Sequence, residues 1–436
     1  MYLIANITNA FRFARAFLLF LRDERKRGTL KANFRSLAKT REIEEDMSWA
    51  ELVEEKVRKY GDRVFLMFEG GQFTYRQMDE NANRIANYLK SLGGGRGKGL
   101  AIMMGNCPQY LDIFIGSQKI GMHSIPINTS LRGDSLLHIL NHSEAEFIMI
   151  DKEILDVYRK IADRTEKIQH VVVNRPSGAQ APVHPPATRS LAEAYLQSPK
   201  KPAGAYGRDD ICFILYTSGT TGLPKGVMYR YGKTTAKLLS IPAYAMYRKS
   251  DILYTGIPLF HGNALWLTVT VAMHRGAKVA LARKFSASRF WDDIRTYHVT
   301  AFNTIGAIIP ILMKQHPKEN DRDNRVRFTL SAACPVDDWE KFEKLFGIKI
   351  YEGYGAMDGG GKSIMNMGNA PVGSIGMPNP GGCILTDTAE KPDILSGKAR
   401  GGKYGVPRVA TTRKGGRPRV SPASTAGRPA PTAPYP

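Results

Sequence analysis

The sequence contains little cysteine, and its cysteines are scattered. The four of them, Cys107, Cys212, Cys334 and Cys383, include no Cys-x-x-Cys pair. This argues against a disulfide framework and a zinc site, and it suits a reducing compartment. The 436 residues show no internal repeat and no coiled-coil heptad pattern, and 43% of them are hydrophobic. Such a chain is long enough to bury a large core, in about two or three domains.

Acidic residues are scarce at the two ends of the chain, and most of the net charge of +22 lies there. Residues 1–40 hold nine Lys or Arg and two acidic residues, whereas residues 394–436 hold nine Lys or Arg and no acidic residue. The middle, 41–393, therefore carries only +6. A basic nucleic-acid binder is the alternative that this charge suggests, but the chain has no recognisable reading motif. We predict no nucleic-acid partner.

The N-terminal apolar stretch is too interrupted for a typical membrane span. Apolar residues recur every three or four positions from Ile4 to Leu21, but Arg12 and Arg15 lie among them and a basic cluster follows through Arg27. A spanning helix needs about 20 nearly uninterrupted apolar residues. We predict that residues 1–40 are a basic amphipathic membrane-associating segment, in which residues 1–27 bind the cytoplasmic face of a membrane as a peripheral segment or a single N-terminal anchor. Packing on the chain's own core is the alternative.

Between the two ends, strand patterns alternate with helix patterns. Ser48 to Glu51 form a capping box that opens a helix, a hairpin is expected around Gly70, and a helix is expected over 108–120. Buried strands are expected at 100–104, 147–150, 170–173, 211–215, 253–257, 278–281, 299–302, 327–330 and 348–351. Residues 174–207 are proline-rich and are expected to form a loop-rich connection. This alternation predicts an α/β fold with a mainly parallel sheet over 41–393, and residues 394–436 are predicted to be a disordered tail.

One loop carries the strongest chemical signal. The stretch Tyr216-Thr-Ser-Gly-Thr-Thr-Gly-Leu-Pro-Lys-Gly226 follows an apolar strand and supplies glycines, hydroxyl groups and one lysine. Glycines let backbone N–H groups approach an anion, hydroxyl groups donate hydrogen bonds, and the ammonium group supplies positive charge. The spacing excludes the Walker A loop, because Leu and Pro separate Gly222 from Lys225 and Gly226 replaces its Ser or Thr. The loop therefore predicts a phosphate site of another kind.

This loop closely resembles the signature loop of the acyl-adenylate-forming (AMP-binding) family, which includes the acyl-CoA synthetases. Pro258 to Asn263 resembles the family motif whose histidine, here His261, lies at the mouth of the acyl site. Ser331 to Pro335 is similar to the loop that lines the adenine, although a plain strand-to-helix turn explains those small residues equally well.

The stretch Tyr351 to Gly359 is similar to the family's Tyr-Gly-x-Thr-Glu motif, with two departures. Met357 replaces a threonine that donates to the α-phosphate, and methionine cannot donate a hydrogen bond. Asp358 replaces a magnesium-binding glutamate and keeps a hard oxygen ligand on a shorter side chain. The resemblance implies that Tyr354 stacks on the adenine.

The stretch from Asn128 to Ala145 looks like that of the fatty acid transport protein branch, also called the very long-chain acyl-CoA synthetases. The resemblance covers about residues 40–385, which correspond to the large N-terminal domain of the family. The family's ribose-binding aspartate and its small C-terminal domain with a catalytic lysine are not found after Pro380. A frameshift, an early truncation or a natural alternative terminus would each explain this break.

The resemblance implies ATP-dependent activation of long- or very long-chain fatty acids to acyl-CoA through acyl-AMP. Coupling of this activation to fatty acid uptake is a further implication. The implied cofactors and co-substrates are ATP, Mg²⁺ and coenzyme A. A nucleotide- and lipid-binding pseudoenzyme is the alternative. The implied catalytic residues are Thr217, Lys225, His261 and Asp358. The implied nucleotide-binding residues are Tyr216, Ser218, Gly219, Thr220, Thr221, Gly222, Ala332, Ala333, Tyr354 and Gly355, and the implied metal ligands are Thr221 and Asp358.

Overall fold

The structure is a computed structural model of the whole chain. It describes residues 47–174, 188–217, 223–233, 246–355, 364–366, 372–375 and 377–378, together with residues 18 and 22. The predictions for the N-terminal helix, for the loop residues 218–222, for Met357 and Asp358, and for the C-terminal tail fall outside these ranges, apart from residues 18 and 22.

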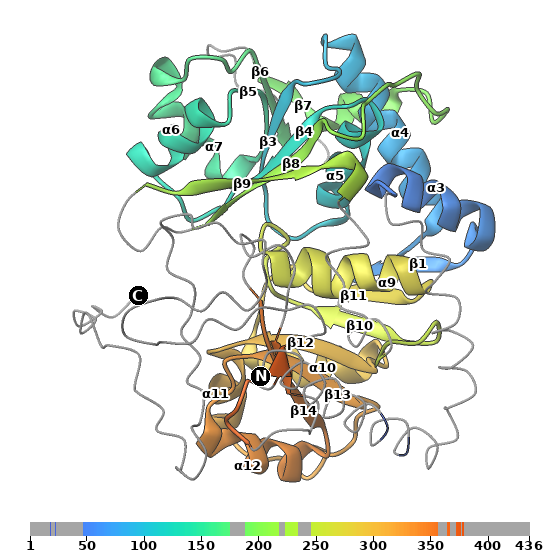
Figure 1. Cartoon of the computed structure of the whole chain (residues 1–436), viewed down its shortest axis with the longest axis vertical. Helices are drawn as coiled ribbons and strands as arrows, with labels where there is room; N and C mark the ends of the chain where they lie inside the picture. The colour runs from blue at the N-terminus through green and yellow to red at the C-terminus, as the bar shows by residue number, and fades with distance from the viewer. Residues whose placement is uncertain are drawn as a thin grey trace, which may run out of the picture.

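The described strands form two sheets, which lie one above the other in Figure 1. The upper sheet has seven strands in the order β7-β6-β5-β3-β4-β8-β9, all parallel except for the antiparallel pair of β8 and β9. Its strands are β3 (Gly99–Met103), β4 (His123–Pro126), β5 (Ala145–Asp151), β6 (His170–Asn174), β7 (Thr188–Ser190), β8 (Ile211–Thr217) and β9 (Lys225–Arg230).

The lower sheet has nine strands in the order β16-β15-β14-β13-β12-β10-β11-β1-β2. Six central strands, from β14 to β1, are parallel, and the flanking strands are antiparallel. Its strands are β1 (Val64–Phe68), β2 (Gly71–Thr74), β10 (Ile252–Thr255), β11 (Lys278–Leu281), β12 (Ala301–Ile305), β13 (Phe328–Ala332), β14 (Lys349–Tyr354), β15 (Ile364–Asn366) and β16 (Met377–Pro378).

Helices connect the parallel strands, as crossover connections require. The α-helices are α3 (Trp49–Tyr60), α4 (Tyr75–Ser91), α5 (Pro108–Lys119), α6 (Gly133–His142), α7 (Leu155–Arg159), α9 (Val271–Arg275), α10 (Ala287–Thr296), α11 (Ile308–Met313) and α12 (Val336–Phe346). Short 3₁₀ turns are η2 (Lys152–Ile154), η3 (Ala162–Arg164), η4 (Leu191–Leu196) and η5 (Tyr231–Lys233), and η6 (Asn263–Thr270) is a π-helix. The predicted α/β fold with mainly parallel sheets is confirmed.

Both faces of the seven-stranded sheet are covered, and alternate residues of its strands point to opposite faces. In β3, Ala101 and Met103 face a cluster formed with α6 and α7, whereas Leu100 and Ile102 face a larger core shared with α4 and α5. This explains why the strand reads as a continuous apolar run rather than an alternating one.

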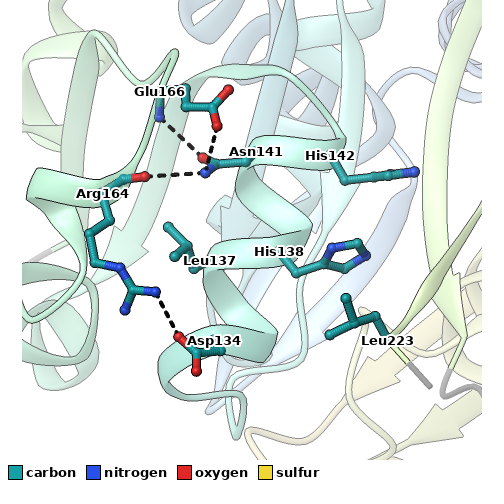
Figure 2. A pocket seen from close by; sticks show the side chains of 8 residues that line it. All are labelled: Asp134, Leu137, His138, Asn141, His142, Arg164, Glu166 and Leu223. Atoms are coloured by element: carbon teal, nitrogen blue, oxygen red, sulfur yellow. Dashed lines mark hydrogen bonds and ion pairs between the residues drawn. The ribbon is translucent and has the colours of Figure 1, made fainter.

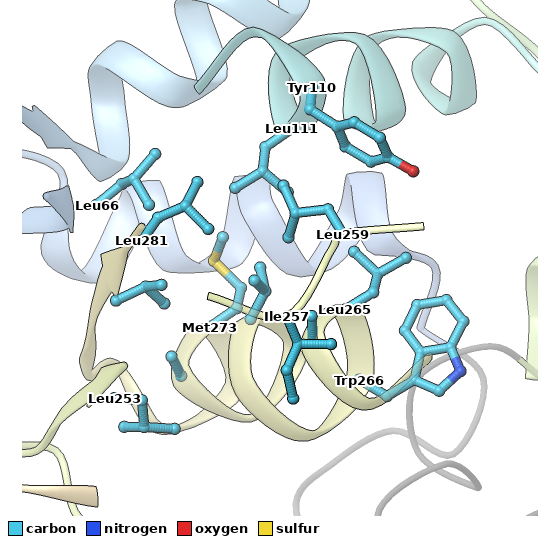
Figure 3. Close-up of a cluster of buried hydrophobic side chains, with 14 of the residues drawn as sticks. Leu66, Tyr110, Leu111, Leu253, Ile257, Leu259, Leu265, Trp266, Met273 and Leu281 are labelled. Carbon is cyan, nitrogen blue, oxygen red and sulfur yellow. The ribbon is translucent and has the colours of Figure 1, made fainter. Parts of the chain in front are cut away.

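The larger core joins the two sheets. In Figure 3, Tyr110 and Leu111 of α5 lie above Leu265 and Trp266 of η6, and all four side chains belong to one buried cluster. Asn106, in the β3–α5 connection, ties the sheets together with hydrogen bonds, because its Nδ2 donates to the Ile257 carbonyl at 3.0 Å and to the Ala282 carbonyl at 2.9 Å.

Two local expectations compare differently with the structure. The capping box is confirmed: the Glu51 N–H donates to Ser48 Oγ at 3.2 Å, and the Ser48 N–H donates to Glu51 Oε2 at 2.8 Å. The expected loop-rich connection over 174–207 is described at 174 and 188–207, where it includes two short elements that were not expected, β7 and η4. A three-residue strand such as β7 is fixed by its pairing with β6 and leaves almost no sequence pattern.

Candidate functional site

The predicted phosphate loop lies between the last two strands of the seven-stranded sheet. Thr217 ends β8, Lys225 begins β9, and the two residues face each other in the antiparallel register. The pair is preceded by Tyr216 opposite Gly226. The hairpin, labelled β8 and β9 in Figure 1, therefore brings a hydroxyl group and an ammonium group to the same end of an edge pair.

Packing explains why glycine follows Lys225. A Cβ atom added to Gly226 would lie 2.8 Å from Cγ2 of Ile214, which is closer than side chains tolerate, and 3.2 Å from Cζ of Tyr216, which is a tight contact. Tyr216 is half-buried, and this burial raises its pKa to about 12. Its hydroxyl group therefore stays protonated at neutral pH and can both donate and accept hydrogen bonds.

The other predicted nucleotide residues lie at the carboxyl ends of neighbouring strands in the nine-stranded sheet. Ala332 ends β13, and Tyr354 ends β14, which pairs with β13 in parallel. Ala333 and Gly355 follow these two strand ends. In open parallel sheets, ligands bind beyond the carboxyl ends of the strands. The structure thus brings Ala332, Ala333, Tyr354 and Gly355 to one edge of the sheet, and their contact with a nucleotide stays a prediction.

Ala333 has an unusual backbone conformation. Its φ is 68°, in the left-handed region, and its side chain is exposed. Non-glycine residues avoid this region because Cβ approaches the following carbonyl oxygen, at a cost of about 1–2 kcal/mol. Such strain is retained where the surrounding structure holds the residue in place.

Glu352 holds Ala333 in this conformation. Its side chain, on a residue only 3% exposed, accepts hydrogen bonds from the N–H of Ala333 and, at 3.1 Å, from the N–H of Cys334. Burial raises the pKa of this carboxyl group, and the two backbone donors oppose that shift. This role of Glu352 was not predicted from the sequence, although an acidic residue directly before a motif tyrosine and glycine was a visible signal.

His261 lies in the connection that follows β10. Its Nδ1 accepts the N–H of Asn263 at 3.1 Å, which places the proton of the neutral ring on Nε2. Although the residue is exposed, partial desolvation by its neighbours lowers the pKa of its imidazole. The chain then enters η6, and π-helical turns are frequent at functional sites.

Aromatic packing joins the His261 segment to the phosphate hairpin. Trp266 of η6 contacts Phe213 of β8, with ring centroids 4.8 Å apart, and Tyr229 of β9, with centroids 6.0 Å apart. Phe213 and Tyr229 stack on each other at 4.4 Å. Both strands of the hairpin therefore rest on the helix that begins two residues after His261.

The metal prediction is not tested, because Thr221 and Asp358 lie outside the described residues. Among the residues that the structure does describe, no group of three or more His, Cys, Asp or Glu side chains is arranged to hold a metal ion. The same applies to the predicted roles of Ser218, Gly219, Thr220 and Gly222, which stay predictions.

Two curated proteins illustrate the sequence relationships. Long-chain fatty acid transport protein 6 of Mus musculus is 32% identical over 329 residues, which cover 74% of this chain and 52% of that protein. The medium/long-chain-fatty-acid–CoA ligase FadD6 of Mycobacterium tuberculosis is 29% identical over 364 residues, covering 83% of this chain and 59% of that protein. The chain thus spans a little over half the length of these relatives.

Solved structures share the fold at low sequence identity. The anthranilate CoA ligase AuaEII, in complex with anthranoyl-AMP, has a TM-score of 0.72 and 22% identity, over 81% of this chain and 69% of that one. The N-terminal domain of FACL13 from Mycobacterium tuberculosis has a TM-score of 0.63 and 24% identity, over 73% of this chain and 78% of that one. The model of the family described as AMP-binding enzyme matches residues 53–397. The chain belongs to the AMP-binding enzyme family.

Proposed function

We propose that this chain binds ATP and a long- or very long-chain fatty acid and takes part in activating the acid to acyl-CoA through acyl-AMP. The observation that carries this proposal is the meeting of Ala333 and Tyr354 at adjacent strand ends, with Glu352 fixing the Ala333 backbone. A flat aromatic side chain beside an exposed backbone suits a purine ring. The names of the relatives, which include fatty acid transport proteins and a fatty acid–CoA ligase, support the acyl substrate.

In the proposed reaction, a carboxylate oxygen of the fatty acid attacks the α-phosphorus of ATP and pyrophosphate leaves. The sulfur of coenzyme A then attacks the acyl carbon and AMP leaves. Both steps need the reactants held in line and the developing phosphate charge neutralised. Lys225 supplies positive charge beside Thr217, and His261 lies at the acyl entrance. The remaining proposed phosphate contacts are Ser218, Thr220 and Thr221, and Asp358 and Thr221 are the proposed Mg²⁺ ligands.

The test is ATP–pyrophosphate exchange with the 436-residue chain and saturated fatty acids of increasing length. We expect labelled pyrophosphate to enter ATP only when a fatty acid is present, and to do so faster with long acids than with short ones. An exchange rate that is the same with and without fatty acid, or that is higher with an aromatic acid such as benzoate, would contradict the proposed substrate.

A nucleotide- and lipid-binding pseudoenzyme is the second candidate, and Met357 favours it. This residue stands where the family motif has a threonine that donates to the α-phosphate, and a thioether has no donor. The pseudoenzyme predicts ATP binding without exchange. Met357→Thr should then produce measurable exchange while the nucleotide affinity stays close to that of the parent chain.

We also propose that residues 1–27 place the protein on the cytoplasmic face of a membrane, where activation would be coupled to fatty acid uptake. In the described part of the chain, no helix combines the length and apolar character that a membrane span requires. Flotation with vesicles that contain anionic lipid, compared with neutral vesicles and with a chain lacking residues 1–27, tests the proposal. Equal recovery of both chains would contradict it.

A further inference from the structure

Helix α6 lies against the loop end of the phosphate hairpin, and two of its histidines contact residues on either side of the loop, Tyr216 and Pro224. Nδ1 of His142 lies 2.8 Å from the hydroxyl oxygen of Tyr216 on β8. Nε2 of His138 lies 3.0 Å from the carbonyl oxygen of Pro224, directly before β9. Because a carbonyl oxygen can only accept, His138 carries its proton on Nε2 and donates it.

The spacing of the two histidines makes this double contact possible. Residues four apart lie on one face of a helix. The two imidazole rings are 5.2 Å apart, and the ring of His142 meets the ring of Tyr216 edge-on at 5.8 Å. A continuous row of three rings therefore runs from α6 to β8.

Helix α6 is also bonded to η3 and to the segment that follows it, as Figure 2 shows. Asn141 donates from Nδ2 to the Arg164 carbonyl at 3.2 Å and accepts the Glu166 N–H at 3.1 Å. Asp134 pairs with Arg164 at 2.9 Å. The helix is thus held by these bonds and can act as a fixed support for the hairpin.

A hollow of about 500 Å³ runs along this face of α6, and Arg164 and Glu166 line it together with residues of the helix. It is lined by both histidines and by Leu223, whose side chain is 55% exposed. In Figure 2, Leu223 approaches His138 from the hairpin side. The two histidine hydrogen bonds are thus polar contacts between α6 and the hairpin, and Tyr216 has a further hydrogen bond to Ser143, the C-cap residue of α6.

We propose that His138 and His142 are positioning residues for nucleotide binding, which hold Thr217 and Lys225 at a fixed separation and orientation. The inference rests on the proposed function, since it assumes that these two residues contact the phosphates of ATP. The two hydrogen bonds reach Tyr216 on β8 and Pro224 directly before β9, and so fix the distance of both sides of the hairpin from α6. Neither histidine needs to touch the nucleotide.

The experiment measures amide hydrogen exchange of residues 211–217 and 225–230 without nucleotide, and ATP affinity by calorimetry, in the full chain. The variants are His138→Ala and His142→Ala, with the exposed His316→Ala as control. His138→Gln keeps a donor near the position of Nε2, and His142→Asn keeps a polar atom near the position of Nδ1. We expect the alanine variants to speed exchange in the hairpin and weaken ATP binding about three- to tenfold, while Gln and Asn restore most of both.

Unchanged hairpin exchange in both alanine variants would overturn the inference. So would Gln and Asn variants that behave no better than alanine, because a purely space-filling role would not distinguish them. If hairpin exchange responds as expected but the parent chain binds no ATP, the histidines do position the hairpin and the proposed function is the part that fails. Thermal unfolding of each variant confirms that the rest of the chain stays folded.

Discussion

The side-chain oxygen of Asn106 accepts the backbone N–H of Leu259 at 2.8 Å, two residues before His261. Asn106 also donates to the carbonyl groups of Ile257 and Ala282. Its three hydrogen bonds therefore join the β3–α5 connection to the segment that carries His261 and to the end of β11. The side chain of Asn106 is 3% exposed, so water cannot easily replace these bonds.

Asn106→Ala should lower the free energy of unfolding by about 2–4 kcal/mol, because it leaves three backbone groups without their partner in a buried place. Asn87→Ala is the matched control. Asn87 also donates twice to backbone carbonyls, of Ser198 and Lys200, but at the surface. Urea unfolding measures both. If the two variants lose the same free energy of unfolding, burial does not increase the contribution of the Asn106 hydrogen bonds to stability.

Asn106 also illustrates what the sequence could not predict. The capping box and the cores of the strands follow from local patterns, but Thr217, Lys225, Ala332 and Tyr354, which were expected in loops, lie within strands β8, β9, β13 and β14. The partners of Asn106 lie more than 150 residues away along the chain, or close to 180 in one case. A single asparagine after a strand is locally indistinguishable from an ordinary turn residue.

Strand boundaries show a second limit. The strand expected at 299–302 is found at Ala301–Ile305, and the one expected at 327–330 is found at Phe328–Ala332. In both cases polar residues extend the strand at its carboxyl end, where parallel pairing with neighbours supplies the hydrogen bonds. Hydrophobic pattern alone ends a strand too early when its last residues are buried polar side chains such as Asn303, Thr304 and Ser331.

Ala333→Gly should relieve backbone strain, since glycine adopts a φ of 68° without penalty. Ala332→Gly is the control, because Ala332 is in β13 and does not have a positive φ. Glycine in a strand costs about 0.5–1 kcal/mol. We expect the two variants to differ by about 1–2 kcal/mol in unfolding free energy, with Ala333→Gly the more stable. The reverse order in urea unfolding would contradict the strain assigned to Ala333.

Lys225→Ala should weaken ATP binding by about tenfold or more, because it removes the positive charge beside Thr217. Hydrogen bonds to charged groups are worth about 1.5–3 kcal/mol. Isothermal calorimetry with ATP measures the loss, and Lys160→Ala, an exposed lysine after α7, serves as control. If both variants bind ATP with the same affinity, Lys225 is not part of the nucleotide site.

Asp112, in α5, should make the stability of the protein depend on pH. Its side chain is buried between α4 and η4, and Tyr195 donates to its Oδ2 at 2.8 Å. Burial raises the pKa of this carboxyl group to about 8, so the folded protein holds its proton at neutral pH. An aspartate in the unfolded chain has a pKa of about 3.9.

Between these two values, the folded state binds one proton more than the unfolded state. Stability must then fall as the pH rises from about 4 to about 8, by at most about 1.4 kcal/mol for each pH unit from this group. Asp112→Asn keeps an acceptor for Tyr195 and removes the titration, so its unfolding free energy should fall less steeply over that range. Urea unfolding at pH 5, 6, 7 and 8 gives both curves, with Asp156→Asn on the exposed face of α7 as control. If the unfolding free energies of the parent chain and of Asp112→Asn change in parallel with pH, the carboxyl group of Asp112 is ionised in the folded protein. Burial then does not raise its pKa as expected.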